Sequence, residues 1–177
     1  KPYISFGQGV ILSEAEAELR ALVEKSGIPA AWTLLGLSAM PTDHPLNVGM
    51  VGMHGNYGPN VLTNECDVLI ALGMRFDDRV TGNLATYAKQ AKVIHFEIDS
   101  AEVDKNVKTT VAVLADLKES LTALLPLIEK NSHESWHNEF KEKYKIELEA
   151  VINDELKPKK EGISMGETIE MINKHSK

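Results

Sequence analysis

The chain has 177 residues, of which 43% are hydrophobic and 25% charged, a composition typical of one ordinary soluble domain with a sizeable core. Its formal net charge of -7 argues against a nucleic-acid partner or an anionic membrane surface, because both would repel it. The single cysteine, Cys66, excludes an internal disulfide, and we expect a cytoplasmic protein.

The sequence contains no apolar run long enough for a membrane span, and residues 1–3 have no feature of a signal peptide. The chain begins without methionine, directly at an apolar segment. We therefore expect it to be a piece of a longer protein.

The N-terminal segment predicts a strand, a tight turn and a helix. Residues 3–6 form a short apolar run that ends at Gly7-Gln8-Gly9. Ser13 and Glu16 have the spacing of a capping box, and apolar residues at helical spacing predict a helix over 16–25.

Four further apolar runs predict the other strands, at 29–35, 67–72, 92–98 and 110–114. Each is apolar through its centre without alternation, as in strands that are buried on both faces. Helical segments are expected at about 58–65, 84–89, 101–106 and 117–130. This alternation predicts an α/β fold, a doubly wound, mainly parallel, Rossmann-like sheet with helices on both faces.

The C-terminal part predicts a helical tail. Beyond residue 130 apolar residues recur almost every fourth position, which indicates one amphipathic helix over about 134–155. A linker-like break at 157–160 follows, and Ser164 with Glu167 begins another helix. We predict an α/β domain over 1–130, a helical linker over 131–160 and the start of a further domain over 161–177.

Parallel sheets bind ligands at the carboxyl ends of their strands. Glycines there let the backbone approach a ligand, arginines pair with phosphates, and carboxylates accept hydrogen bonds from ribose hydroxyls. Glycines, arginines, carboxylates and apolar residues predominate at the ends of the predicted strands, and this combination predicts a site for an anionic nucleotide. The residues are Gly7, Gln8, Gly9, Thr33, Leu34, Leu35, Gly73, Met74, Arg75, Asp77, Arg79, Glu97, Ile98, Asp99, Ala115 and Asp116.

Each part of this set also has a purely structural interpretation. Gly7-Gln8-Gly9 lacks the third glycine of the dinucleotide fingerprint, and a tight turn needs the same residues. The run 75–79 also has an interpretation as a solvated loop of mutually neutralising charges, although its position after a buried strand favours a functional role. For Glu97 the alternative is a paired structural carboxylate. No acidic residue ends the second predicted strand, which disfavours NAD.

His54 lies in the uncharged, glycine-rich segment 48–55. No serine, cysteine or carboxylate is nearby in sequence to form a nucleophilic set, so we expect this segment to line a cofactor, although core packing explains its methionines equally well. His133 and His137 have the spacing of a zinc pair but no third ligand. We predict no catalytic residue and no metal site.

Three motifs together give a family resemblance: Gly-Met-Val-Gly-Met-His-Gly at 49–55, Ala-Leu-Gly-Met-Arg-Phe-Asp-Asp-Arg-Val-Thr-Gly-Asn at 71–83, and His-Phe-Glu-Ile-Asp at 95–99. At this spacing they closely resemble the middle domain of the acetolactate synthase family, and the similarity runs from Tyr3 to about Glu129. The resemblance implies a three-domain enzyme whose first and third domains bind thiamine diphosphate and Mg²⁺. The middle domain of that enzyme binds FAD.

The resemblance also implies the reaction and partners of the full-length enzyme. It condenses two pyruvates, or pyruvate and 2-oxobutanoate, to 2-acetohydroxy acids with loss of CO₂ in branched-chain amino-acid synthesis. A homodimer or larger homo-oligomer and a small regulatory subunit are implied. The catalytic glutamate and the diphosphate-magnesium motif belong to the other two domains, so we expect this chain to bind flavin without catalysing a reaction alone.

Carried over residue by residue, the resemblance implies these flavin contacts: Gly7, Gly9, Thr33, Leu34, Gly52, Met53, His54, Gly73, Arg75, Asp77, Arg79, Val80, Glu97, Ile98 and Asp116. Two positions depart from the family, since Ala115 replaces a usual glycine and Gln8 stands where Gly or Ala is common. Two alternatives remain, the middle domain of a related thiamine enzyme such as glyoxylate carboligase or an oxidase, and a spacer that binds no nucleotide.

Overall fold

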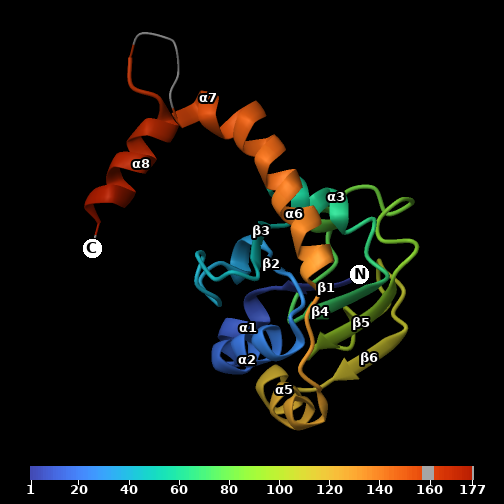
Figure 1. Cartoon of the computed structure of the whole chain (residues 1–177). Helices are drawn as coiled ribbons and strands as arrows, with labels where there is room; N and C mark the ends of the chain where they lie inside the picture. Colours follow the sequence, from blue (N-terminus) through green and yellow to red (C-terminus); the bar gives the residue numbers. More distant parts are fainter. Residues whose placement is uncertain (157–161, 177) are drawn as a thin grey trace.

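Six strands form one parallel sheet, with the order β3-β2-β1-β4-β5-β6 (Figure 1). The computed structural model describes residues 1–156 and 162–176. The strands are β1 (Pro2–Phe6), β2 (Ala30–Trp32), β3 (Asn47–Met50), β4 (Val68–Leu72), β5 (Lys92–Glu97) and β6 (Val111–Leu114). Chain order reverses between β1 and β4, so this pair forms the switch point of a doubly wound sheet.

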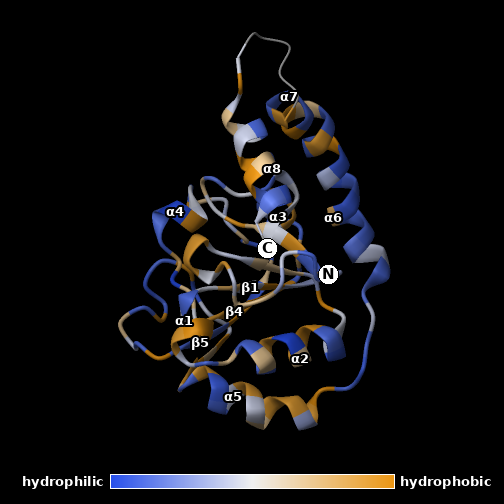
Figure 2. Cartoon of the chain, turned by 90° about the vertical axis from the view of Figure 1, so that its left-hand side faces the viewer, coloured by the Kyte–Doolittle hydropathy of each residue, from blue (hydrophilic) through white to orange (hydrophobic). Residues whose placement is uncertain are grey.

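Helices cover both faces of this sheet (Figures 1 and 2). One face carries α1 (Gln8–Leu12), α2 (Glu16–Ser26) and α5 (Leu117–Leu124), and the other carries α3 (Tyr57–Leu62) and α6 (Glu134–Glu147). In β1, Ile4 and Phe6 pack under the first group, whereas Tyr3 packs under the second. Strands buried on both faces explain the unalternating apolar runs. The predicted fold class is confirmed.

The connection from β1 to α2 differs from the prediction. The residues after β1 form α1, and the Ser13 hydroxyl donates to the Gly9 carbonyl oxygen at 2.6 Å, at the end of this short helix. Helix α2 therefore begins after Ala15, without a side-chain cap. The predicted capping box of Ser13 and Glu16 is wrong, because Ser13 is used by the preceding helix.

Several other segments also differ. Strand β3 is not predicted from the sequence, and the predicted strand over 29–35 ends at Trp32, followed by the short helix η1 (Leu34–Gly36). The predicted helices at 84–89 and 101–106 are turns, where Ala88 and Asp104 have positive φ values of 45° and 60°. The helix predicted over 117–130 ends at Leu124, before η2 (Leu125–Leu127), which contains a proline.

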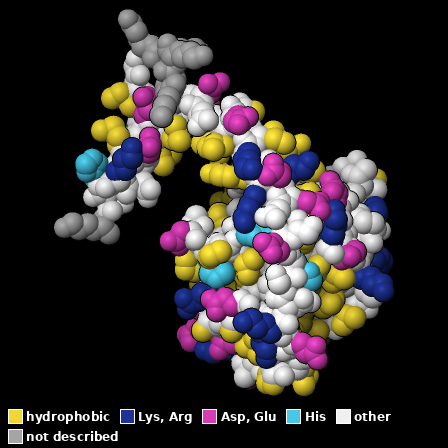
Figure 3. Space-filling model, in the orientation of Figure 1, with side chains coloured by type: hydrophobic (Ala, Val, Ile, Leu, Met, Phe, Trp, Pro, Cys, Tyr) yellow, Lys and Arg dark blue, Asp and Glu magenta, His cyan; other side chains and the backbone are white. Residues whose placement is uncertain are grey.

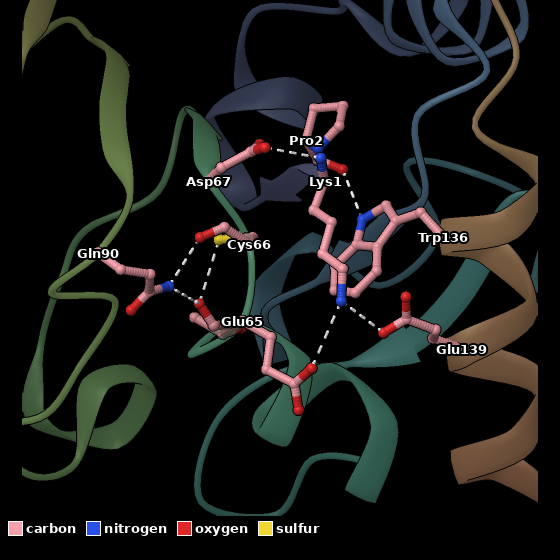
Figure 4. Close-up of polar contacts among 9 residues, drawn as sticks. Lys1, Pro2, Glu65, Cys66, Asp67, Gln90, Trp136 and Glu139 are labelled. Atoms are coloured by element: carbon pink, nitrogen blue, oxygen red, sulfur yellow. Dashed lines mark hydrogen bonds and ion pairs between the residues drawn. The ribbon is translucent and has the colours of Figure 1, made fainter.

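The predicted amphipathic helix over 134–155 is confirmed. It comprises α6, a π-helical turn labelled η3 (Leu148–Ile152) and α7 (Asn153–Leu156). Its first part packs on the sheet, since Trp136 is buried in the core and its Nε1 donates to the Pro2 carbonyl at 2.8 Å. Lys1 Nζ pairs with Glu139 at 2.7 Å and Glu65 at 3.6 Å (Figure 4).

Helix α8 (Met165–His175) follows α7, turns back from its end and lies apart from the sheet (Figure 1). The predicted capping box of Ser164 and Glu167 is confirmed. The predicted linker at 157–160 lies outside the described residues. Large apolar side chains of this segment are exposed (Figure 3), namely Ile163, Met165, Ile169, Met171 and Ile172. Among the helices that the structure describes, none is both long and apolar enough to cross a membrane.

Candidate functional site

A cleft of about 480 Å³ opens at the carboxyl ends of the strands. It straddles the switch point between β1 and β4, where parallel sheets bind ligands, and its volume lies in the usual range for small-molecule sites. Its lining comes from the segments that follow five of the six strands: Gln8, Gly9, Leu12, Ser13, Thr33, Leu34, Leu35, Gly73, Met74, Arg75, Asp77, Arg79, Val80, Phe96, Glu97, Ile98, Ala115, Asp116 and Leu117.

Two glycines form a backbone contact at the switch point. The Gly9 N–H donates to the Gly73 carbonyl at 2.9 Å, and a Cβ on Gly9 would lie 2.6 Å from Gly73 Cα. Gly73 also has a φ of +54°, in the left-handed region. A Cβ on Gly7 would lie 2.7 Å from the Gly73 carbonyl oxygen. These glycines therefore let the loops after β1 and β4 touch, and Gly9 and Gly73 present their backbone to the cleft.

The loop after β4 brings two arginines to the cleft. Asp77 caps α4 (Asp78–Thr81) by accepting from the Arg79 N–H at 3.1 Å. Arg75 Nη2 lies 3.6 Å from Asp77 Oδ2, and 62% of the Arg75 side chain is exposed. Arg79 has no carboxylate partner within 4.0 Å in residues 1–156 and 162–176. Asp77 thus accompanies Arg75, whereas the Arg79 guanidinium is available for bidentate pairing with an anion.

Glu97 ends β5, and its largely buried side chain lines the cleft. Its Oε1 accepts from the backbone N–H groups of Ile98 and Asp99, at 2.9 and 3.3 Å. Its Oε2 lies 3.8 Å from His95 Nε2 and makes no hydrogen bond within the described part of the chain. One oxygen therefore has a structural role, while the other is free to accept a hydrogen bond from a ligand hydroxyl.

Large apolar side chains surround these polar groups. Leu12, Leu34, Leu35 and Ile98 all line the cleft, and each is between 61% and 74% exposed. Apolar walls with a few convergent polar groups are typical of sites for ring-containing cofactors.

Most of the predicted flavin contacts lie in this cleft, and four do not: Gly7, Gly52, Met53 and His54. The Met53 N–H donates to the Arg79 carbonyl at 2.7 Å, so its segment borders the arginine loop. His54 is exposed outside the cleft. The sequence does not indicate Leu12 and Ser13, because α1 has only five residues and gives no periodic signal. Phe96 and Leu117 are also missed, since apolar strand and helix ends give no sign of ligand contact.

A second cavity of about 500 Å³ lies beside α6. Its lining includes Trp32, Asn47, His137, Lys141 and Tyr144. Burial, reinforced by the charge of Lys141, lowers the pKa of His137. Within the described residues, His, Cys, Asp and Glu side chains form no group of three or more that could hold a metal ion.

Comparison with known proteins matches residues 1–124 to the family described as thiamine pyrophosphate enzyme, central domain. A protein named probable acetolactate synthase large subunit, from Methanocaldococcus jannaschii, is 42% identical over 176 residues, which are 98% of this chain and 30% of that protein. The acetolactate synthase large subunit of Lactococcus lactis is 50% identical over 127 residues, 72% of this chain and 22% of that protein. The chain therefore spans less than a third of either relative.

Proposed function

The chain belongs to the family of thiamine pyrophosphate enzyme central domains, and from this premise we propose that it binds FAD as the central domain of an acetolactate synthase large subunit. The observation that carries the proposal is the cleft at the β1/β4 switch point. It combines two arginines, a fixed carboxylate and an exposed apolar rim.

The donor set of the cleft suits FAD. Arg75 and Arg79 would pair with the pyrophosphate, and Glu97 Oε2 would accept a hydrogen bond from a ribose hydroxyl. Asp116 would lie beside the adenosine half, and Leu34 would contact the flavin half. Bound there, FAD would act as a structural group that ties the strand ends together, without a redox step.

NAD fits this cleft less well than FAD. The segment after β2 begins with Thr33 and Leu34, so it lacks the acidic side chain that receives the ribose of NAD in dinucleotide-binding sheets. A domain that binds no nucleotide and acts only as a spacer is the other candidate, and the exposed apolar rim of the cleft disfavours it.

For the full-length protein we propose the acetolactate synthase reaction, the condensation of two pyruvates or of pyruvate and 2-oxobutanoate with loss of CO₂. Other domains would bind thiamine diphosphate and Mg²⁺, with residues 161–177 beginning one of them after the linker over 131–160. We further propose a cytoplasmic homo-oligomer with a small regulatory subunit, which the words "large subunit" in the relatives' names support. The isolated chain would be catalytically inactive.

The test is titration of FAD with the purified chain, followed by flavin fluorescence, with circular dichroism to verify folding. We expect saturable binding that NAD does not displace. A folded chain and a full-length protein that both fail to retain FAD would contradict the proposal and favour the spacer. Assay of the full-length protein with pyruvate and with glyoxylate distinguishes the synthase from a related thiamine enzyme.

A further inference from the structure

His95 lies directly behind the cleft and is fully buried in β5. Its Nε2 lies 2.8 Å from the carbonyl oxygen of Met74. Because a carbonyl oxygen only accepts hydrogen bonds, Nε2 must carry a proton and donate it. The other ring nitrogen, Nδ1, is buried without a partner in the part of the chain that the structure describes.

The contacts of His95 fall on both sides of Arg75. The hydrogen bond reaches Met74, the residue before Arg75, and the His95 ring packs edge-on against the ring of Phe76, the residue after it, with centroids 5.0 Å apart. Asn106 adds a hydrogen bond from its Nδ2 to the Phe76 carbonyl at 2.7 Å. Within residues 1–156 and 162–176, the one ionic partner of the Arg75 side chain is Asp77, at 3.6 Å. Its position therefore depends on the backbone that His95 anchors.

His95 also lies near a second residue that lines the cleft. Its Nε2 lies 3.8 Å from Glu97 Oε2, the carboxylate oxygen that the backbone leaves free. A leucine of similar size would fill this apolar part of the core without leaving an unpaired ring nitrogen. Nε2 carries one proton, which the Met74 carbonyl accepts, so the interaction that a leucine would lose is this hydrogen bond and not the longer approach to Glu97.

We propose that His95 is a positioning residue for the flavin site: it anchors the backbone on either side of Arg75. This inference rests on the proposed FAD function. It predicts that a side chain with a donor at the position of Nε2 can replace His95, whereas an apolar side chain of similar size cannot.

The first test needs no ligand. Amide hydrogen exchange of the 177-residue chain would be compared between His95→Gln, which keeps a donor at the corresponding atom, and His95→Leu, which removes it. We expect His95→Leu to speed exchange of the Val80 and Thr81 amides, which donate to the Asp77 carbonyl at 3.1 and 2.9 Å, by about tenfold, because the Met74 carbonyl loses its buried partner, while core amides of β1 stay unchanged. His95→Gln should stay within about threefold of the wild type. Unchanged loop exchange in His95→Leu, or equal acceleration throughout the sheet, would overturn the proposal.

The second test measures FAD affinity in a double-mutant cycle with Arg75→Ala. We expect His95→Leu to weaken FAD binding about tenfold when Arg75 is present and less than about threefold when it is absent, since the two residues act as a unit. His95→Gln should bind FAD about as well as the wild type. The control is His137→Leu, which removes a histidine that lies outside the cleft and should leave FAD binding unchanged. Additive losses would overturn the proposal. If the folded wild-type chain binds no FAD, the proposed function fails in this chain, and the exchange experiment alone decides on His95.

Discussion

The contact between Gly9 and Gly73 can be tested by adding one methyl group. In Gly73→Ala the new Cβ would lie 2.7 Å from Gly9 Cα, where it meets backbone that has no room to move. Gly82 provides a control without the steric contact, because its φ is also positive, at +56°, yet a Cβ there meets no heavy atom within 4 Å. Its ψ of −124° lies outside the left-handed helical region, so an alanine there carries a backbone cost alone. The pair separates the steric cost from the conformational cost.

The expected losses follow from these two costs. A backbone with positive φ costs an alanine about 1–3 kcal/mol, and a cost of this size applies at both positions. Overpacking adds about 1–3 kcal/mol at Gly73 alone. We therefore expect Gly82→Ala to lower the free energy of unfolding by about 1–3 kcal/mol and Gly73→Ala by about 2–6 kcal/mol.

Urea unfolding followed by circular dichroism measures both losses, with an unchanged slope against urea showing that the unfolded state is the same. Gly73→Ala should also weaken FAD binding, because the methyl group would separate the loops after β1 and β4. Equal losses of stability in the two variants would refute the argument that the close backbone contact limits this position.

Arg75→Ala should weaken FAD binding by about tenfold or more, whereas Lys92→Ala, at the opposite end of the strands, should leave it unchanged; equal effects in titration would remove Arg75 from the phosphate site. Trp136→Phe keeps an aromatic ring on the sheet but loses the hydrogen bond to the Pro2 carbonyl, and should lower the free energy of unfolding by about 1 kcal/mol in urea. An unchanged midpoint would show that this bond contributes nothing. Burial raises the pKa of the Cys66 thiol from 9.0 to about 12. The folded state therefore favours the neutral thiol, and its contribution to stability is complete below about pH 9 and is lost as the pH rises towards about 12. The difference in unfolding free energy between wild type and Cys66→Ala should fall across this range, and a constant difference would contradict the assignment.

The sheet was predictable where its strands are buried on both faces. Val68–Leu72 forms β4 because an unbroken apolar run suits a central strand. Strand β3 was not predicted, because it is a short edge strand without an unbroken apolar run. It contains Asn47 and Gly49, and Gly49 has a φ of +112°. Local signals also fail where a neighbouring element competes for a residue, as α1 does for Ser13.

The candidate site was predictable to the extent that strand ends identify it. Arg75 and Arg79 lie in the loop after β4, Glu97 is the last residue of β5, and all three line the cleft. Contacts between residues that are far apart in the sequence cannot be predicted from the spacing of residues along the chain. The packing of Gly9 on Gly73 and the hydrogen bond from His95 to Met74 depend on how the strands are ordered, so only the structure shows them.

The most direct test of the proposed flavin site is nuclear magnetic resonance of the ¹⁵N-labelled chain during titration with FAD. The amide signals of Gly9, Gly73, Arg75 and Ile98 should shift together and saturate, because all four residues line the cleft at the β1/β4 switch point. Shifts confined to the second cavity, beside α6, would place the flavin elsewhere. An unchanged spectrum from a folded chain would contradict flavin binding by this domain alone.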